Sequence, residues 1–229
     1  MTARDKKTEE ITRRLIKRYG EYDVTRGSPF NVLIATILSQ NTNDRNSSQA
    51  FNSLYSVYDT PEKLANAPEE KIADLIKYGG LHRIKARRIK DTALVVMEKY
   101  GGDLDLVCDA DPASARKELM SIEGIGPKTA DCVLLFSCGK DVIPVDTHVF
   151  RVSKRLGIVP EKADHEQAHR ILTEKVPEGK RGSVHVALIR LGREICKAQN
   201  PKHENCPLID ICDYARTVGA YPPKKDVSK

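Results

Sequence analysis

The sequence predicts an all-α protein, and three observations lead to this prediction. Apolar residues recur at helical spacing, as at Ile11, Leu15 and Ile16 near the N-terminus. No segment shows the alternation of apolar and polar residues that marks a half-buried strand. Residues that cap helix N-termini, each followed by a proline suited to the first helical position, occur at Ser28, Thr60 and Asp111.

Length and composition indicate a water-soluble chain. The 229 residues are enough for one large or two modest hydrophobic cores. No apolar run approaches the ~20 residues that cross a bilayer, and the polar N-terminus lacks the apolar region of a signal peptide. We therefore expect a cytoplasmic protein without a membrane partner, in which disulfides are not expected. The net charge of +6 favours polyanionic partners without identifying one.

The first helices follow from local signals. Residues 8–19 form an amphipathic pattern that Gly20 ends. Residues 30–38 are apolar on nearly every side, which predicts a helix at the centre of a core. The polar segment 39–44 follows directly, and it is either a loop that caps the next helix or a functional loop held by rigid elements.

Three short helices are expected before the glycine pair at residues 79–80. Helices are expected at residues 47–57, after Thr60, and at 68–77. A long helix is expected at residues 83–100, after Gly79 and Gly80. Its first turns carry a basic cluster, which either contacts phosphates or forms a solvated face: Arg83, Lys85, Arg87, Arg88 and Lys90.

The sequence of residues 119–131 predicts two helices joined by a tight turn, a helical hairpin. Gly124 and Gly126 allow a sharp turn and close approach of another molecule to the backbone. The second helix begins after the turn, and Lys128 lies on its first turn. Unpaired N–H groups at a helix N-terminus suit an anion such as a phosphate. A lysine at such a place suggests amine chemistry on a nucleic acid.

Helices are further expected at residues 129–137, 148–156, 164–176 and 180–197. Asp146 precedes the second of these, where it is either a helix N-cap or a catalytic carboxylate. Three scattered cysteines are interpreted as small core residues: Cys108, Cys132 and Cys138.

The remaining cysteines predict a metal site. Cys196, His203, Cys206 and Cys212 are spaced as C-x6-H-x2-C-x5-C within 17 residues. Three thiolates and an imidazole suit tetrahedral zinc. They also suit an iron–sulfur cluster in which a histidine replaces one cysteine. The spacing alone does not decide between these metals.

These motifs together resemble endonuclease III, a family of helix-hairpin-helix DNA glycosylases. The resemblance extends over about residues 29–214. It implies a six-helix barrel at residues 27–139. It also implies a second helical half, residues 140–229 joined by residues 1–26, which carries an iron–sulfur cluster.

The resemblance implies a bifunctional DNA glycosylase and AP lyase of base excision repair. Such an enzyme removes oxidised pyrimidines and cleaves the strand 3′ to the abasic site by β-elimination. Lys128 matches the family's catalytic lysine, and Asp146 matches its catalytic aspartate. The implied partner is double-stranded DNA with a damaged base or abasic site, bound by a monomer in the nucleoid.

The resemblance also assigns DNA-binding residues. The loop at residues 39–44 matches the segment that fills the gap left by an extruded base, with Gln40 or Asn41 as the filling side chain. Leu81 matches the apolar wedge after the glycine pair. The hairpin residues Gly124 and Gly126 would hold a phosphate, and His148 is a candidate for phosphate or base contact.

His203 departs from the family pattern, which has a cysteine there. We favour a [4Fe-4S] cluster with three cysteines and this histidine over zinc. Two other functions stay open at this point. One is a mismatch glycosylase that removes uracil or thymine opposite guanine, against which Lys128 argues. The other is a non-catalytic DNA-binding module, in which Lys128 and Asp146 would be a surface lysine and an N-cap.

Overall fold

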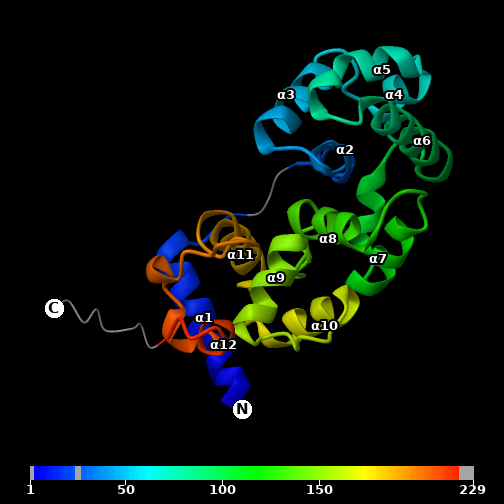
Figure 1. The fold of residues 1–229 in the computed structure, drawn as a ribbon. Coiled ribbons are helices and arrows are strands. Elements are labelled where there is room, and N and C mark those ends of the chain that lie inside the picture. The colour runs from blue at the N-terminus through cyan, green and yellow to red at the C-terminus, as the bar shows by residue number, and fades with distance from the viewer. Residues whose placement is uncertain (1–2, 24–26, 222–229) are drawn as a thin grey trace. The chain divides into compact units, whose positions relative to one another are not determined.

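The computed structural model describes residues 3–23 and 27–221. Within these ranges all regular elements are α-helices or 3-10 helices, and no strand occurs (Figure 1). The all-α fold class predicted from the sequence is therefore confirmed. No helix in the described ranges is long and apolar enough to span a bilayer.

The chain divides into two compact units. The barrel unit, as we call it, is Thr25–Lys140. The cluster unit combines Met1–Val24 with Asp141–Lys229, so the N-terminal helix belongs with the C-terminal part of the chain.

The barrel unit is built around α2 (Pro29–Ser39). Ser28 caps this helix by accepting a hydrogen bond from the Asn31 amide, and Pro29 occupies its first turn, as the sequence predicts. Most of α2 is buried, and it packs against α3 and α8. The other elements of this unit are α3 (Asp44–Tyr55), α4 (Pro61–Asn66), α5 (Glu69–Leu75), η1 (Lys77–Gly79), α6 (His82–Tyr100), η2 (Leu104–Asp109), α7 (Pro112–Met120) and α8 (Pro127–Phe136).

In the cluster unit, α1 (Ala3–Tyr19) lies beside elements from the other end of the chain (Figure 1). Ile11 and Leu15 are fully buried in a core shared with the C-terminal helices. Arg14 donates to both carboxylate oxygens of Asp210, at 2.6 and 3.0 Å. The remaining elements are α9 (Thr147–Leu156), α10 (His165–Lys175), α11 (Arg181–Glu194), η3 (His203–Asn205), η4 (Ile209–Ile211) and α12 (Asp213–Thr217).

The helix expected at about residues 68–77 is present as α5, which ends at Leu75, and a separate 3-10 turn, η1, follows it before Gly80, whose φ is +65°. The prediction of no disulfide was wrong, since Cys108 and Cys138 form one, with their Cα atoms 5.0 Å apart. They are 30 residues apart in sequence, so only the tertiary fold brings η2 close to the segment that follows α8. Cys132 is buried and forms no disulfide, as predicted.

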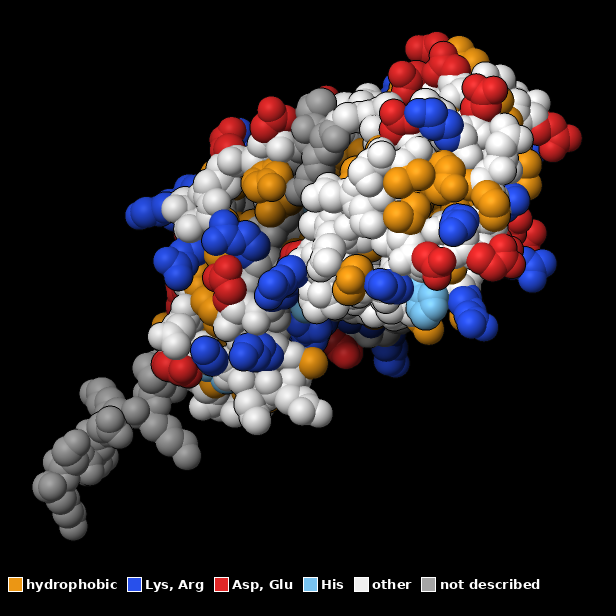
Figure 2. Space-filling model, turned by 90° about the horizontal axis from the view of Figure 1, so that it is seen from above, with side chains coloured by type: hydrophobic (Ala, Val, Ile, Leu, Met, Phe, Trp, Pro, Cys, Tyr) orange, Lys and Arg blue, Asp and Glu red, His pale blue; other side chains and the backbone are white. Residues whose placement is uncertain are grey.

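The surface carries both signs of charge. Lysine, arginine and acidic side chains are interspersed over the face drawn in Figure 2. On this face the basic side chains are thus interspersed with acidic ones and do not form a continuous basic coat.

A buried ion pair holds α7 and α8 together. The Asp131 carboxylate is almost fully buried, with 2% of its side chain exposed. It accepts hydrogen bonds from Arg116 Nε at 2.7 Å and from a second guanidinium nitrogen at 3.4 Å. Since a carboxylate buried without a partner is costly, the pair fixes how the two helices of the hairpin meet.

Asp131→Ala is expected to lower the free energy of unfolding by about 3 kcal/mol, because the Arg116 charge then loses its buried partner. The matched control is Asp91→Ala, which removes an exposed pair with Arg87 at 3.8 Å and is expected to cost about 0.5 kcal/mol or less. Urea unfolding followed by circular dichroism measures both. Equal losses in the two variants would contradict the role given to Asp131.

Candidate active site and metal centre

The turn between α7 and α8 offers backbone donors. Gly124 adopts a φ of +81°, which glycine tolerates and other residues rarely adopt. Gly126 is the N-cap of α8, and no side chain caps this end. Within the described residues, the amides of Gly124, Gly126 and Lys128 donate to no backbone carbonyl. Three N–H groups at a helix N-terminus are therefore available to bind an anion.

Lys128 lies beside these donors on the first turn of α8. Its side chain is half-buried, and it has no hydrogen bond or ion pair with any described residue. The amine is thus held near an anion-binding turn without a carboxylate that would keep it paired. This is the placement that the sequence predicts for a lysine that reacts with a nucleic acid.

In the barrel unit, the buried ammonium group of Lys85 holds the start of two loops, one after α2 and one after η1. Lys85 Nζ donates to the carbonyl of Leu38 at 2.8 Å and to that of Gly79 at 2.7 Å. The side chain is buried, and this burial lowers the pKa of the Lys85 ammonium. Lys85 therefore ties the end of α2 to η1, rather than forming the solvated or phosphate-binding face considered from the sequence.

Shortly after each of the two carbonyls that Lys85 holds, one exposed residue has a strained backbone. Asn41 has a φ of +52° and Leu81 a φ of +49°, a left-handed conformation that costs ~1–3 kcal/mol when the residue is not glycine. Asn41 is exposed, and 53% of Leu81 is exposed despite its apolar side chain. Strain at exposed side chains on a rigid base indicates a functional role. Gln40 is half-buried and is held by another side chain.

Asp146 belongs to the cluster unit, where it caps α9. Its Oδ1 accepts a hydrogen bond from the Val149 amide at 2.7 Å. Two histidines hold the chain just before it: His185 Nδ1 lies 2.9 Å from the Pro144 carbonyl, and His169 Nδ1 lies 3.1 Å from the Ile143 carbonyl. A carbonyl only accepts, so both nitrogens carry the proton. Asp146 is thus a well-positioned carboxylate, and its catalytic role stays a prediction.

His148 lies two residues after Asp146 and contacts Gly192 of α11. Its Nδ1 is 3.1 Å from an Arg151 guanidinium nitrogen, which also donates to the Gly192 carbonyl at 3.1 Å. A Cβ at Gly192 would lie 3.0 Å from that same Nδ1. These contacts give His148 a packing role within the cluster unit, and its contact with DNA stays a prediction.

The four candidate metal ligands line one cavity. Cys196, His203, Cys206 and Cys212 line it together with Tyr214, whose ring stacks on that of His203 with centroids 5.9 Å apart. Burial raises the pKa of the Cys206 thiol to about 11. A bound metal would stabilise the thiolate form of this ligand, and the soft donor set fits an iron–sulfur cluster.

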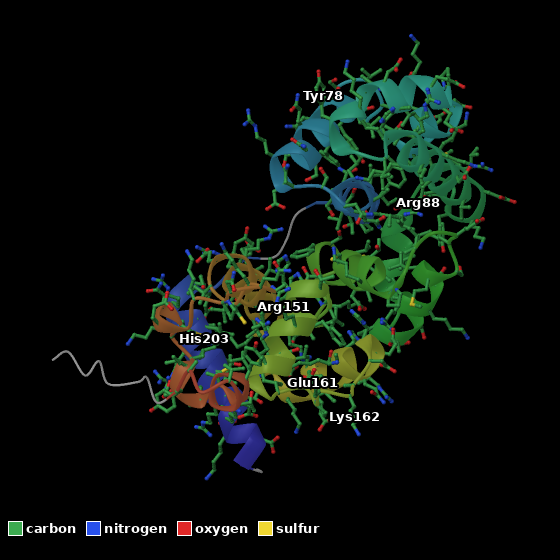
Figure 3. The ribbon with its side chains drawn as sticks, viewed as in Figure 1. Tyr78, Arg88, Arg151, Glu161, Lys162 and His203 are labelled. Carbon is green, nitrogen blue, oxygen red and sulfur yellow. A yellow bond between two sulfur atoms is a disulfide. The ribbon has the colours of Figure 1, made fainter. Side chains whose placement is uncertain are left out.

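Two arginines of α9 connect this segment to Asp146. Arg151 Nε donates to the Cys196 carbonyl at 3.2 Å (Figure 3). Arg155 donates to the Lys197 carbonyl at 2.6 Å, and its guanidinium lies over the Tyr214 ring. No sequence pattern predicts these contacts, because the two arginines look like part of an ordinary basic helix face.

Comparison with known proteins identifies the family. Residues 34–178 match the model of the HhH-GPD superfamily base excision DNA repair proteins. Residues 196–212 match that of the iron-sulfur binding domain of endonuclease III. The endonuclease III of Thermotoga maritima is 39% identical over 211 residues, which cover 92% of this chain and 94% of that protein. The chain belongs to the endonuclease III family.

Further relatives agree with this assignment. The endonuclease III of Bacillus subtilis is 35% identical over 194 residues, 85% of each chain. A structure of a trapped endonuclease III–DNA covalent intermediate superposes with a TM-score of 0.83 at 30% identity, covering 96% of this chain and all of the other. A thermostable thymine-DNA glycosylase superposes with a TM-score of 0.82 at 25% identity, covering 94% of this chain and all of the other.

The family assignment confirms several predictions. The fold is the helix-hairpin-helix glycosylase fold, and the protein is a DNA glycosylase with AP lyase activity. Its cofactor is a [4Fe-4S] cluster, and the zinc alternative has no support.

Proposed function

We propose that this base excision repair enzyme removes damaged pyrimidines from double-stranded DNA and cuts the strand 3′ to the abasic site, with Lys128 as its nucleophile. The observation that carries the assignment of Lys128 is its unpaired amine on the first turn after an anion-binding turn. We further expect the enzyme to act as a monomer on chromosomal DNA in the nucleoid.

Lys128 also decides between two activities that share this fold. A mismatch glycosylase that only hydrolyses the base needs no amine nucleophile, and the solved thymine-DNA glycosylase shows that a similar fold serves another glycosylase. A lysine at the hairpin enables covalent chemistry at the sugar, which a fold comparison alone does not reveal. Lyase activity is therefore the expected property of this chain.

Substrate binding would begin at the hairpin. The amides of Gly124 and Gly126 would hold a phosphate near the lesion, with the N-terminus of α8 directed at its charge. The target nucleotide must leave the stack before its C1′ can be reached, at a cost of a few kcal/mol. A damaged base pairs and stacks poorly, so this cost is lower for the correct substrate.

The proposed reaction uses the amine of Lys128 as the nucleophile and the carboxylate of Asp146 as its partner. The neutral Lys128 amine forms a bond to C1′ as the N-glycosidic bond breaks, and the base leaves with the bonding electrons. Asp146 would accept a proton or stabilise positive charge developing on the sugar. The C1′–O4′ bond of the sugar then breaks, O4′ takes up a proton and the attached nitrogen loses one, which leaves an open-chain Schiff base at C1′. The Schiff base acidifies C2′, and loss of a C2′ proton expels the 3′ phosphate by β-elimination.

The cluster would be held by Cys196, His203, Cys206 and Cys212. When bound, it supplies four metal–ligand bonds that cross-link the C-terminal segment. Arg151 and Arg155 of α9 donate hydrogen bonds to backbone carbonyls of this segment, so a fixed segment would also hold α9, whose N-cap is Asp146.

Lys128→Gln is expected to abolish borohydride trapping of the enzyme on DNA that contains an abasic site, because the amide cannot form a Schiff base. Lys117→Gln, which changes an exposed lysine on α7, is the control and should trap like the wild type. Trapped complexes are counted on denaturing gels. A trapped complex with Lys128→Gln would refute the nucleophile.

Asp146→Asn is expected to keep DNA affinity and lose about 10²-fold or more in single-turnover rate, a typical loss for a proton-transfer group. Asparagine caps helices as well as aspartate does, so α9 should stay intact. Rates are measured on an oxidised-pyrimidine duplex and affinity by anisotropy. An unchanged rate would remove Asp146 from the mechanism.

His203→Ala is expected to lower the iron and sulfide content per chain, whereas His203→Cys should retain it, because only the second variant supplies a ligand. His165→Ala is the control, since His165 also stacks on an aromatic ring of the cluster unit, Phe150, with centroids 3.9 Å apart. Metal analysis and visible absorption measure the cluster. Normal iron in His203→Ala would show that His203 is not a ligand.

A further inference from the structure

Arg88 connects three parts of the barrel unit. It lies on α6 and is half-buried (Figure 3). Its Nη1 donates to Gln40 Oε1 at 2.8 Å, at the end of α2. Its side chain also lies against the hairpin turn: a Cβ built on Gly124 would be 2.9 Å from Arg88 Nε and 3.1 Å from its Cδ. One side chain thus links the turn that precedes α8 to the loop that follows α2.

The charge of Arg88 is not neutralised within the described chain. Its hydrogen-bond partner Gln40 is uncharged, and no carboxylate forms an ion pair with it there. The preceding residue differs, since Arg87 is paired with Asp91. A guanidinium has five N–H donors, and the contact with Gln40 uses one of them. Arg88 therefore adds an unpaired positive charge beside Gly124 in the hairpin turn.

The contact also fixes the orientation of the Gln40 amide. A guanidinium only donates, so the amide oxygen must face Arg88 and the amide NH2 must face away. Gln40 is thereby held to the hairpin. Asn41, the next residue, is exposed, is strained at a φ of +52° and has no side-chain hydrogen bond with a described residue. Of the two candidate gap-filling side chains, only Asn41 is unrestrained.

We propose that Arg88 is a positioning residue that locks Gln40 onto the hairpin turn, so that phosphate binding at the turn presents Asn41 as the side chain that fills the gap in the duplex. The proposal rests on the proposed function, because a gap exists only when a nucleotide leaves the stack. It makes Gln40 a brace and assigns the contact with the opposite strand to Asn41.

The experiment measures dissociation constants for two duplexes by fluorescence anisotropy at one salt concentration. One duplex carries a tetrahydrofuran abasic analogue, and the other is undamaged. Their ratio gives the preference for a gap. Arg88→Ala is expected to lower this ratio about tenfold, the loss typical of a hydrogen bond from a charged group. Arg87→Ala, which removes the same charge from an adjacent position, should weaken binding to both duplexes equally if at all.

Variants of Gln40 and Asn41 test which of the two side chains fills the gap and which one only supports the loop. Asn41→Ala should lower the ratio at least as much as Arg88→Ala. Gln40→Ala should lower it to the same extent as Arg88→Ala, and the double variant Gln40→Ala with Arg88→Ala should lower it no further, because both single changes break one contact. Arg88→Lys should not restore the ratio, since lysine lacks the planar fork.

Two outcomes would overturn the proposal: Arg88→Ala and Arg87→Ala giving the same ratio, or Asn41→Ala leaving the ratio unchanged while Gln40→Ala lowers it. Thermal unfolding identifies any misfolded variant, and Arg88→Gln then replaces Arg88→Ala with the same expected loss. Failure of the proposed function has a separate signature, because wild-type protein would then not be trapped by borohydride on abasic DNA.

Discussion

The turn between α7 and α8 is the constraint on which the rest of the structure depends. Buried Asp131 and its partner Arg116 set how the two helices meet, and the residues of α8 beyond its first turn are buried. The first turn of α8 therefore has little freedom. This packing sets the positions of Lys128 and of the free amides of Gly124 and Gly126, so the proposed nucleophile and the proposed anion site would need little ordering when DNA binds.

A second set of contacts ties the loops that we propose to contact DNA to the same unit. Lys85 holds the carbonyls of Leu38 and Gly79 with one buried ammonium. The left-handed conformations of Asn41 and Leu81 are unfavourable in isolation, and they persist because the chain is held on either side. Buried polar groups in this unit thus support exposed, strained residues, and we propose that these residues present their side chains to the duplex.

Much of the fold could be predicted from sequence because its signals are local. Helix caps such as Ser28 depend on neighbouring residues, and the glycine turn before Lys128 is defined by three consecutive positions. The metal segment has a recognisable spacing. The Cys108–Cys138 disulfide could not be predicted, because its two cysteines are 30 residues apart and only the tertiary fold brings them together. Arg88 and Lys85 looked alike in one basic cluster, and only tertiary contacts separate their roles.

The most direct test of the account is peptide mapping of the wild-type enzyme after borohydride trapping on abasic DNA. Nuclease and protease digestion followed by mass spectrometry identifies the residue that carries the sugar remnant. The account predicts a single modified peptide, with the added mass on Lys128. A remnant on another lysine or on the N-terminal amine would contradict it, whatever the activity of the substituted enzymes.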